Sequence, residues 1–209
     1  MKFNIIPVTN FQQNCTIVSC EKTRKAAVVD PGGDLERILY KVDQLGFELE
    51  KILITHAHID HAGAAGQLAR EHQLPIEGPH QEDQFWIDAL PDQSAMFAFP
   101  AAEPFQPDRW LNQGDIVEIG ESSLEVRYCP GHTPGHVIFY QADKRFAIVG
   151  DVIFKGSIGR TDFPRGDHQT LLDSIHQQIF TLGNDVQLIT GHGPTTTVGE
   201  EKISNPFVN

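Results

Sequence analysis

The chain has 209 residues, of which 40% are hydrophobic and 21% are charged, so it can bury a core and extensive disorder is not expected. Sixteen basic side chains stand against 28 acidic ones, and the net charge of −12 argues against a nucleic-acid partner. No apolar stretch is long enough to span a membrane, and no secretory signal is present, so no membrane partner is expected. Three cysteines without a C-x-x-C pair favour reduced thiols in a cytoplasmic protein.

The first half of the chain predicts a small sheet followed by further alternating helices and strands. Short β-rich runs at the start predict an antiparallel meander. Apolar positions between residues 35 and 45 recur with a 3.6-residue period, and Gly46 is expected to end that helix. The predicted strands are residues 2–8, 15–20, 26–30, 51–54 and 74–78, and the predicted helices are residues 35–45 and 62–72.

The second half is again β-rich and then helical. Between the halves, residues 91–107 are rich in Pro and Phe and lack periodicity, which predicts a loop or lid. Its Phe97, Phe99 and Phe105 either cover a cleft or fill the core. Two similar halves, each with its own sheet, predict two sheets packed face to face with helices outside. The predicted strands are residues 117–119, 124–129, 137–141, 146–149 and 186–190, and the predicted helix is residues 167–182.

The segment THAHIDHAG, residues 55–63, follows a short buried strand and carries three histidines and an aspartate. Residues two apart in an extended segment point the same way, so His56 and His58 converge on one point. Asp60 and His61, one turn further on, face a second point close by. Imidazole and carboxylate ligands suit Zn, Fe or Mn, and the absence of a nearby Cys argues against a closed structural zinc site.

Three further strand ends resemble this one. The stretch PGHTPGH offers His132 or His136, VGD offers Asp151, and TGHG offers His192. Seven ligands are too many for one tetrahedral ion but fit two ions if one carboxylate bridges them. A single histidine after a strand is usually an ordinary polar residue, and that interpretation is given to His72, His80, His168 and His176.

In these residues the sequence resembles the metallo-β-lactamase superfamily, whose signature is H-x-H-x-D-H. VVDPGG, the signature, PGHTPGH, VGD and TGHG follow the family order. GSIGRTDFPRGD and GHGPTTTVGEEK look typical of the short bacterial hydrolases similar to glyoxalase II. The resemblance implies an α/β fold, a four-layer αββα sandwich with the metals at the sheet edges. It implies one domain over residues 1–209, without the C-terminal helical domain of full-length glyoxalase II.

The resemblance also implies a ligand set, and it favours His132 over His136. Two divalent ions are expected, Zn and/or Fe, with Mn also acceptable. True β-lactamases of this fold generally lack the bridging carboxylate, which argues against antibiotic hydrolysis. The implied ligands are His56, His58 and His132 for one metal and Asp60, His61 and His192 for the other, with Asp151 bridging.

The implied reaction is thioester hydrolysis with a metal-bound hydroxide as nucleophile and no catalytic side chain. The substrate implied by the family is S-D-lactoylglutathione, an intermediate of methylglyoxal detoxification, and the products are D-lactate and glutathione. Arg160 matches a basic residue that contacts glutathione in the group, although a surface arginine is an equal alternative. Asp162 stands where a tyrosine is often found, so weak glutathione affinity is expected. Asp30 either orients a ligating histidine or caps a turn.

Other functions of the same fold remain open at this point. Persulfide dioxygenases share the signature and resemble GRTDF, and they hold one iron on the equivalents of His56, His132 and Asp151. The acidic charge argues against a nuclease, and so complete a ligand set argues against a non-catalytic metal-binding protein. No coiled-coil pattern is present, so a monomer is expected.

Overall fold

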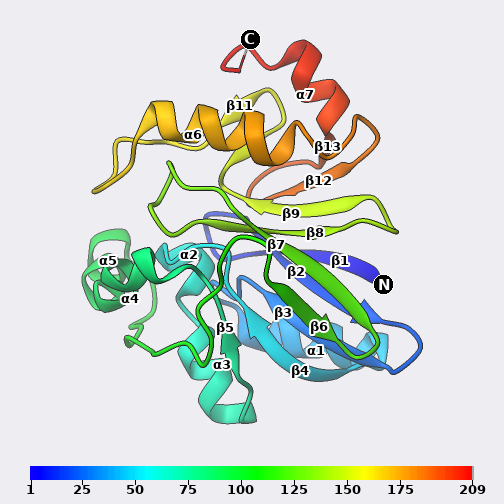
Figure 1. Ribbon diagram of the computed structural model, residues 1–209. Helices are drawn as coiled ribbons and strands as arrows, with labels where there is room; N and C mark the ends of the chain where they lie inside the picture. The colour runs from blue at the N-terminus through cyan, green and yellow to red at the C-terminus, as the bar shows by residue number, and fades with distance from the viewer. Residues whose placement is uncertain (209) are drawn as a thin grey trace.

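Two mixed β-sheets face each other in the computed structural model, which describes residues 1–208 (Figure 1). In the first sheet β1 to β3 run antiparallel to one another, and β4 and β5 join them in parallel. Its strands, in spatial order, are β1 (Lys2–Val8), β2 (Gln13–Cys20), β3 (Lys25–Val29), β4 (Glu48–Leu53) and β5 (Ile76–Glu77).

The second sheet contains most of the second half of the chain. Strands β6 to β9 form an antiparallel meander, β12 pairs in parallel with β9, and β13 closes the edge. A small hairpin, β10 (Ile153–Phe154) and β11 (Ser157–Ile158), stands apart. The sheet strands, in spatial order, are β13 (Thr196–Thr197), β12 (Gln187–Thr190), β9 (Phe146–Gly150), β8 (Val137–Gln141), β7 (Ser122–Tyr128) and β6 (Ile116–Ile119).

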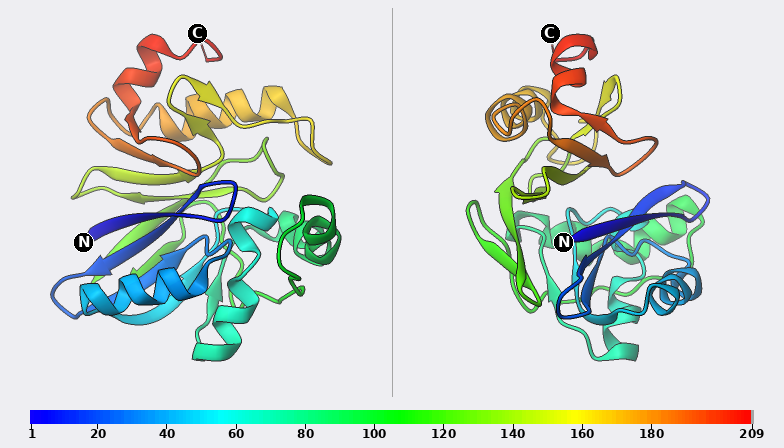
Figure 2. Two further views of the ribbon diagram at one scale, coloured as in Figure 1. Left: turned by 180° about the vertical axis from the view of Figure 1, so that it is seen from behind. Right: turned by 90° about the vertical axis from the view of Figure 1, so that its right-hand side faces the viewer.

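Helices cover the outer face of each sheet, as the views in Figures 1 and 2 show. Those on the first sheet are α1 (Leu35–Leu45), α2 (Ile59–Ala62), α3 (Ala65–His72), the 3₁₀ turn η1 (Gln81–Asp83), α4 (Gln84–Asp88) and α5 (Leu90–Phe97). Those on the second are α6 (His168–Ser174), its π-helical continuation η2 (Ile175–Ile179) and α7 (Val198–Ser204). No helix within residues 1–208 is long and apolar enough to cross a bilayer.

Three apolar clusters hold these four layers together. Alternation along the strands explains them: Ile17 of β2 packs toward the helices of the first layer, whereas Val18 faces the second sheet. Ile52 and Leu53 of β4 divide in the same way. Because both faces of these strands are buried, the sequence shows continuous apolar runs there. The predicted αββα sandwich is confirmed.

Several local predictions need correction. The predicted helix over residues 62–72 is two helices, because α2 begins within the histidine motif and α3 follows after a break. The loop predicted over residues 91–107 was wrong for its first part, which belongs to α5. Pro91 lies in the first turn of that helix, where its missing N–H costs nothing. Gly46 ends α1 as expected, with φ of +67°.

Candidate metal centre

All seven predicted ligands lie together at one end of the sandwich. The turn after β4 and helix α2 supply the residues of the H-x-H-x-D-H motif, and the turns after β7, β9 and β12 supply the rest. Strand ends of both sheets therefore meet at one edge, as expected for the carboxyl ends of parallel strands β4, β9 and β12. Three groups have ligand atoms within 4.8 Å of one another: His56, His58 and His132; His56, His61 and Asp151; and Asp60, His61 and His192.

The first group, called the three-histidine group below, consists of buried imidazoles. His58 Nδ1 lies 3.0 Å from His132 Nε2. The other nitrogen of His132, Nδ1, donates to the carbonyl of Arg160 at 2.7 Å, so its Nε2 lone pair points inward. His56 Nε2 is buried and has no hydrogen-bond partner within residues 1–208. Such an unpaired polar atom is costly unless something outside the protein chain occupies the site.

The group of Asp60, His61 and His192, together with the neighbouring Asp151, combines carboxylates and imidazoles. Asp60 Oδ2 lies 3.1 Å from His192 Nε2, and Asp151 Oδ1 lies 3.2 Å from His61 Nε2. His192 Nδ1 donates to the carbonyl of Phe11 at 3.2 Å, which turns Nε2 toward the group. Asp151 also belongs to the group with His56, so its carboxylate lies between the two predicted metal positions.

Asp30 orients one of these imidazoles. Its carboxylate accepts hydrogen bonds from Thr55 N (2.7 Å) and Thr55 Oγ1 (2.6 Å), and its Oδ2 lies 3.0 Å from His61 Nδ1. The contact fixes the proton of His61 on Nδ1 and leaves Nε2 free for a ligand. Of the two roles suggested by the sequence for Asp30, the geometry therefore matches the orientation of a histidine.

His136 has a role that the sequence did not reveal. It belongs to none of the three groups within residues 1–208, but its Nε2 accepts the backbone N–H of Asp151 at 3.1 Å. Its ring stacks on His56 with centroids 4.6 Å apart. The repeated P-G-H in PGHTPGH was the only signal for it, and that signal does not distinguish a ligand from a supporting residue.

The pKa shifts fit a site for cations. Burial lowers the pKa of His56 and His58 well below the usual histidine value, so these rings are neutral, the form that binds metals. Burial would also lower the pKa of His61, but the charges of Asp151 and Asp60 outweigh it and raise that pKa well above its usual value.

The carboxylate of Asp151 completes this set of donor atoms. Burial alone would raise the pKa of Asp151, yet the imidazoles of His61 and His132 hold it below its usual range. Gly191 allows this crowding, because a Cβ there would lie 2.0 Å from Asp151 Oδ1. The neutral rings of His56 and His58, the ionised carboxylate of Asp151 and an unpaired buried nitrogen together fit a divalent cation of the Zn, Fe or Mn type.

A cleft of about 620 Å³ opens above the groups and is mostly apolar. Phe97 lines it and is 39% exposed, whereas Phe99 and Phe105 pack on the first-sheet core. The ring of His58 packs against both Trp86 and Phe163, with centroids 4.7 and 4.8 Å away. The other lining residues include Phe11, Met96, Phe154 and Ile158. The walls therefore exclude water from the histidines and favour apolar parts of a ligand.

Among residues 1–208, Arg160 is the one Lys or Arg side chain that lines this cleft. Its guanidinium makes two hydrogen bonds to Asp162, at 2.9 and 2.7 Å, and lies 4.6 Å over the ring of Phe163. The side chain is 68% exposed, so a ligand can reach it. An anionic ligand would compete with Asp162 for this cation.

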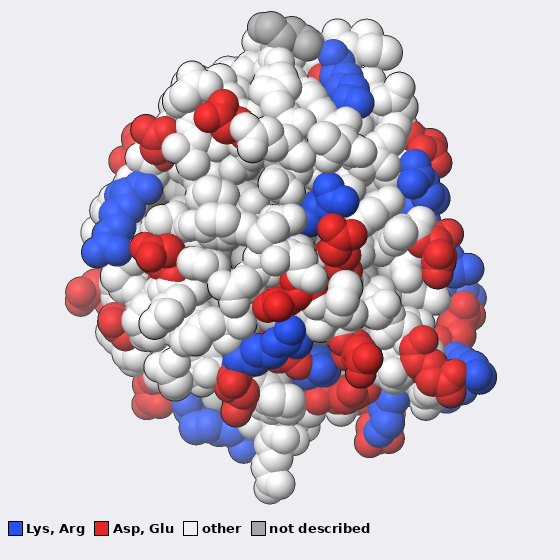
Figure 3. Space-filling model, in the orientation of Figure 1, with Lys and Arg blue, Asp and Glu red and all other residues white. Residues whose placement is uncertain are grey.

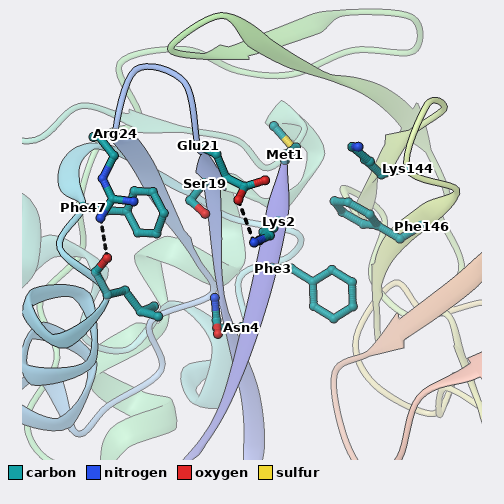
Figure 4. Close-up of a pocket in the computed structure, with 11 residues that line it drawn as sticks. Met1, Lys2, Phe3, Asn4, Ser19, Glu21, Arg24, Phe47, Lys144 and Phe146 are labelled. Atoms are coloured by element: carbon teal, nitrogen blue, oxygen red, sulfur yellow. Dashed lines mark hydrogen bonds and ion pairs between the residues drawn. The ribbon is translucent and has the colours of Figure 1, made fainter.

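A second hollow, of about 520 Å³, is lined by none of the seven predicted ligands (Figure 4). Three of its charged side chains have partners: Lys2 pairs with Glu21 at 2.6 Å, and Arg24 donates to the Leu45 carbonyl at 2.6 Å. No His or Cys is among the described residues that line it. The metal cleft, rather than this hollow, is the candidate functional site.

Comparisons with known proteins agree with this geometry. A family model described as Metallo-beta-lactamase superfamily matches residues 8–192. The chain is 46% identical to the Hydroxyacylglutathione hydrolase GloC of Haemophilus influenzae, over 100% of this chain and 99% of that protein.

Three solved structures are similar over nearly the whole chain. BLEG-1 B3 metallo-beta-lactamase is 34% identical with a TM-score of 0.91, and the match covers 100% of both chains. TTHA1623, solved in a di-iron-bound form, is 31% identical with a TM-score of 0.89, covering 98% of this chain and 99% of that one. ETHE1 from Myxococcus xanthus is 25% identical with a TM-score of 0.82, covering 99% of this chain and 84% of that one.

Proposed function

The chain belongs to the metallo-beta-lactamase superfamily, and we propose that it is a metal-dependent hydrolase that cleaves S-D-lactoylglutathione into D-lactate and glutathione. The observation that carries the proposal is the convergence of seven His and Asp side chains at one edge of the sandwich, five of which line one cleft. The full-length likeness to a hydroxyacylglutathione hydrolase supports the choice of a thioester over other carbonyl substrates.

Each group of ligands would bind its own cation. The three-histidine group would hold one cation, Asp60, His61 and His192 a second, and Asp151 would bridge them. Bound divalent cations would supply Lewis acidity that activates water and polarises the thioester carbonyl. The pairing of imidazoles with carboxylates suits Zn and/or Fe, with Mn acceptable, and a di-iron-bound relative supports two ions.

The protein chain itself orients the ligating histidines. Asp30 and the carbonyl of Arg160 hold the outer nitrogens of His61 and His132, so the inner nitrogens stay aimed at the centre. The apolar walls keep bulk water away, which strengthens the electrostatic interactions inside. Arg160 is proposed to contact a carboxylate of the glutathione moiety after that carboxylate displaces Asp162.

The surface supports a small-molecule partner rather than nucleic acid. On the face shown in Figure 3, Lys and Arg side chains lie mostly beside Asp and Glu, so no extended basic region attracts phosphates there. We further propose a single-domain monomer over residues 1–209 that acts in the cytoplasm. Three buried, unpaired cysteines support a reducing compartment.

The direct test is turnover of S-D-lactoylglutathione by the purified protein, with its bound metal counted. We expect free thiol to appear in proportion to D-lactate, with two metal ions per chain. Asp151→Ala protein, purified in the same way, is the control for contaminating thioesterases. Absence of thioester cleavage by metal-loaded protein would refute the proposed function.

A second candidate function is a single-iron persulfide dioxygenase, favoured by the likeness to ETHE1. In this chain, His56, His132 and Asp151 would hold the iron. One iron per chain, with oxygen consumed on glutathione persulfide and no thioester cleavage, would establish it. Because BLEG-1 is described as a B3 metallo-beta-lactamase, a β-lactam belongs in the same substrate panel, and we expect it to turn over far more slowly than the thioester.

A further inference from the structure

Two buried polar side chains that belong to none of the candidate ligand groups lie between β5 and the end of α5. Asp83 is the last residue of η1 and is fully buried, and Gln93 in α5 is 5% exposed. No motif marks either residue, and neither belongs to the ligand groups found within residues 1–208. Burial of a carboxylate is costly, so its hydrogen bonds show what it is used for.

The carboxylate of Asp83 links the two turns that carry the three-histidine group. Its Oδ2 accepts from the backbone N–H of Ala57 at 3.0 Å and from Thr133 Oγ1 at 2.9 Å, and its Oδ1 accepts from Gly135 N at 2.6 Å. Ala57 lies between two ligands of the first turn, and Thr133 directly follows the ligand of the second. One side chain therefore fixes the distance between the turns.

The contact is close. A Cβ at Gly135 would lie 2.7 Å from Cγ of Asp83, so only glycine allows the second turn to approach this far. Burial raises the pKa of Asp83 to about 7, while the hydrogen bonds from Ala57, Thr133 and Gly135 favour the charged form. The second turn therefore packs directly on this side chain.

Gln93 holds the first turn from another direction. Its Oε1 accepts from Ile59 N at 3.0 Å, and its Nε2 donates to the carbonyls of Ala57 (3.3 Å) and Trp86 (2.9 Å). The backbone around the motif has left the sheet and needs other partners, which these two side chains supply. Gln93 also connects the turn to α4 and α5, which line the cleft.

We propose that Asp83 is a positioning residue that holds the turns bearing His56, His58 and His132 in register, so that this group is assembled before a cation binds. Gln93 supports the same turn from α5. The inference rests on the proposed metal centre. It predicts a stronger effect on the three-histidine group, because Asp83 bonds the backbone between His56 and His58 and the turn after His132, but no residue of helix α2 or of the turn that carries His192.

The test measures cobalt affinity of the full chain at each group separately. In a His192→Ala background only the three-histidine group is complete, and in a His58→Ala background only the other group is complete. Competition with a chelator gives the Co²⁺ dissociation constant with and without Asp83→Asn, which retains the shape but removes one acceptor. We expect the constant to rise roughly 10- to 100-fold in the first background and by a smaller factor in the second.

Asp88→Asn is the matched control, because it removes the same charge from an exposed position of α4 and should not alter either constant. Equal weakening of both groups, or no weakening of the first, would overturn the inference. If Asp83→Asn protein does not fold by circular dichroism, Thr133→Val removes only one of the three hydrogen bonds. It should then weaken the first group selectively, and an unchanged constant would overturn the inference. Wild-type protein that binds no cobalt would instead refute the metal centre itself.

Discussion

The hydrogen bonds of Asp30 allow a quantitative prediction of stability. Asp30 is buried and has a left-handed backbone conformation with φ of +54°. Asparagine adopts this conformation readily, so Asp30→Asn changes the hydrogen bonding without straining the backbone, whereas Asp30→Ala changes both. Comparison of the two variants therefore separates the side chain from the backbone.

The size of the effect follows from the three groups that contact the carboxylate. Alanine would leave Thr55 N, Thr55 Oγ1 and His61 Nδ1 buried without this acceptor. A buried donor that loses its acceptor costs about 1–3 kcal/mol, so for three such donors we expect a loss of roughly 3–9 kcal/mol, plus about 1 kcal/mol for the backbone. Asparagine retains an oxygen for part of this network, and a loss of roughly 1–3 kcal/mol is expected.

Urea unfolding in the presence of a chelator measures these free energies without the contribution of bound metal. Asp34→Asn is the matched control: Asp34 has the same left-handed conformation, with φ of +52°, but its side chain is exposed. It should lose no more than a few tenths of a kcal/mol. A loss below about 1 kcal/mol for Asp30→Ala would refute the claim that these buried groups depend on the carboxylate.

Three other predictions concern activity and pH. Asp151→Ala should abolish thioester hydrolysis and keep the fold, as turnover and circular dichroism would show; retained activity would contradict the site. Arg160→Ala should raise KM for glutathione thioesters more than it lowers kcat, and an unchanged KM would leave Arg160 as a surface residue. In the presence of a chelator, the difference in unfolding free energy between wild type and Asp83→Asn should decrease as the pH rises from about 4 to about 7. The folded carboxyl of Asp83, with a pKa of about 7, keeps its proton there, whereas the unfolded one, near 3.9, loses it. A difference that does not vary with pH in urea unfolding would contradict this reasoning.

The convergence of the seven candidate ligands was predictable because the segments that carry them follow apolar strands, and strand ends of a sandwich converge on one edge. For the same reason, the four layers followed from the alternation of strands and periodic helices. Asp83 and Gln93 were not predictable. Their partners are backbone groups of turns distant in sequence, and such contacts leave no pattern in residue type. Helix α5 was missed because Pro91 and nearby phenylalanines obscured its weak periodicity.

Neither sheet contains a complete set of ligands. The turn after β4 extends from the first sheet, while His132, Asp151 and His192 follow strands of the second. A chain emerging from the ribosome thus has no finished second group until β12 has been added beside β9. Binding of the second proposed cation would therefore require β12, and a chain cut short before that strand would lack His192.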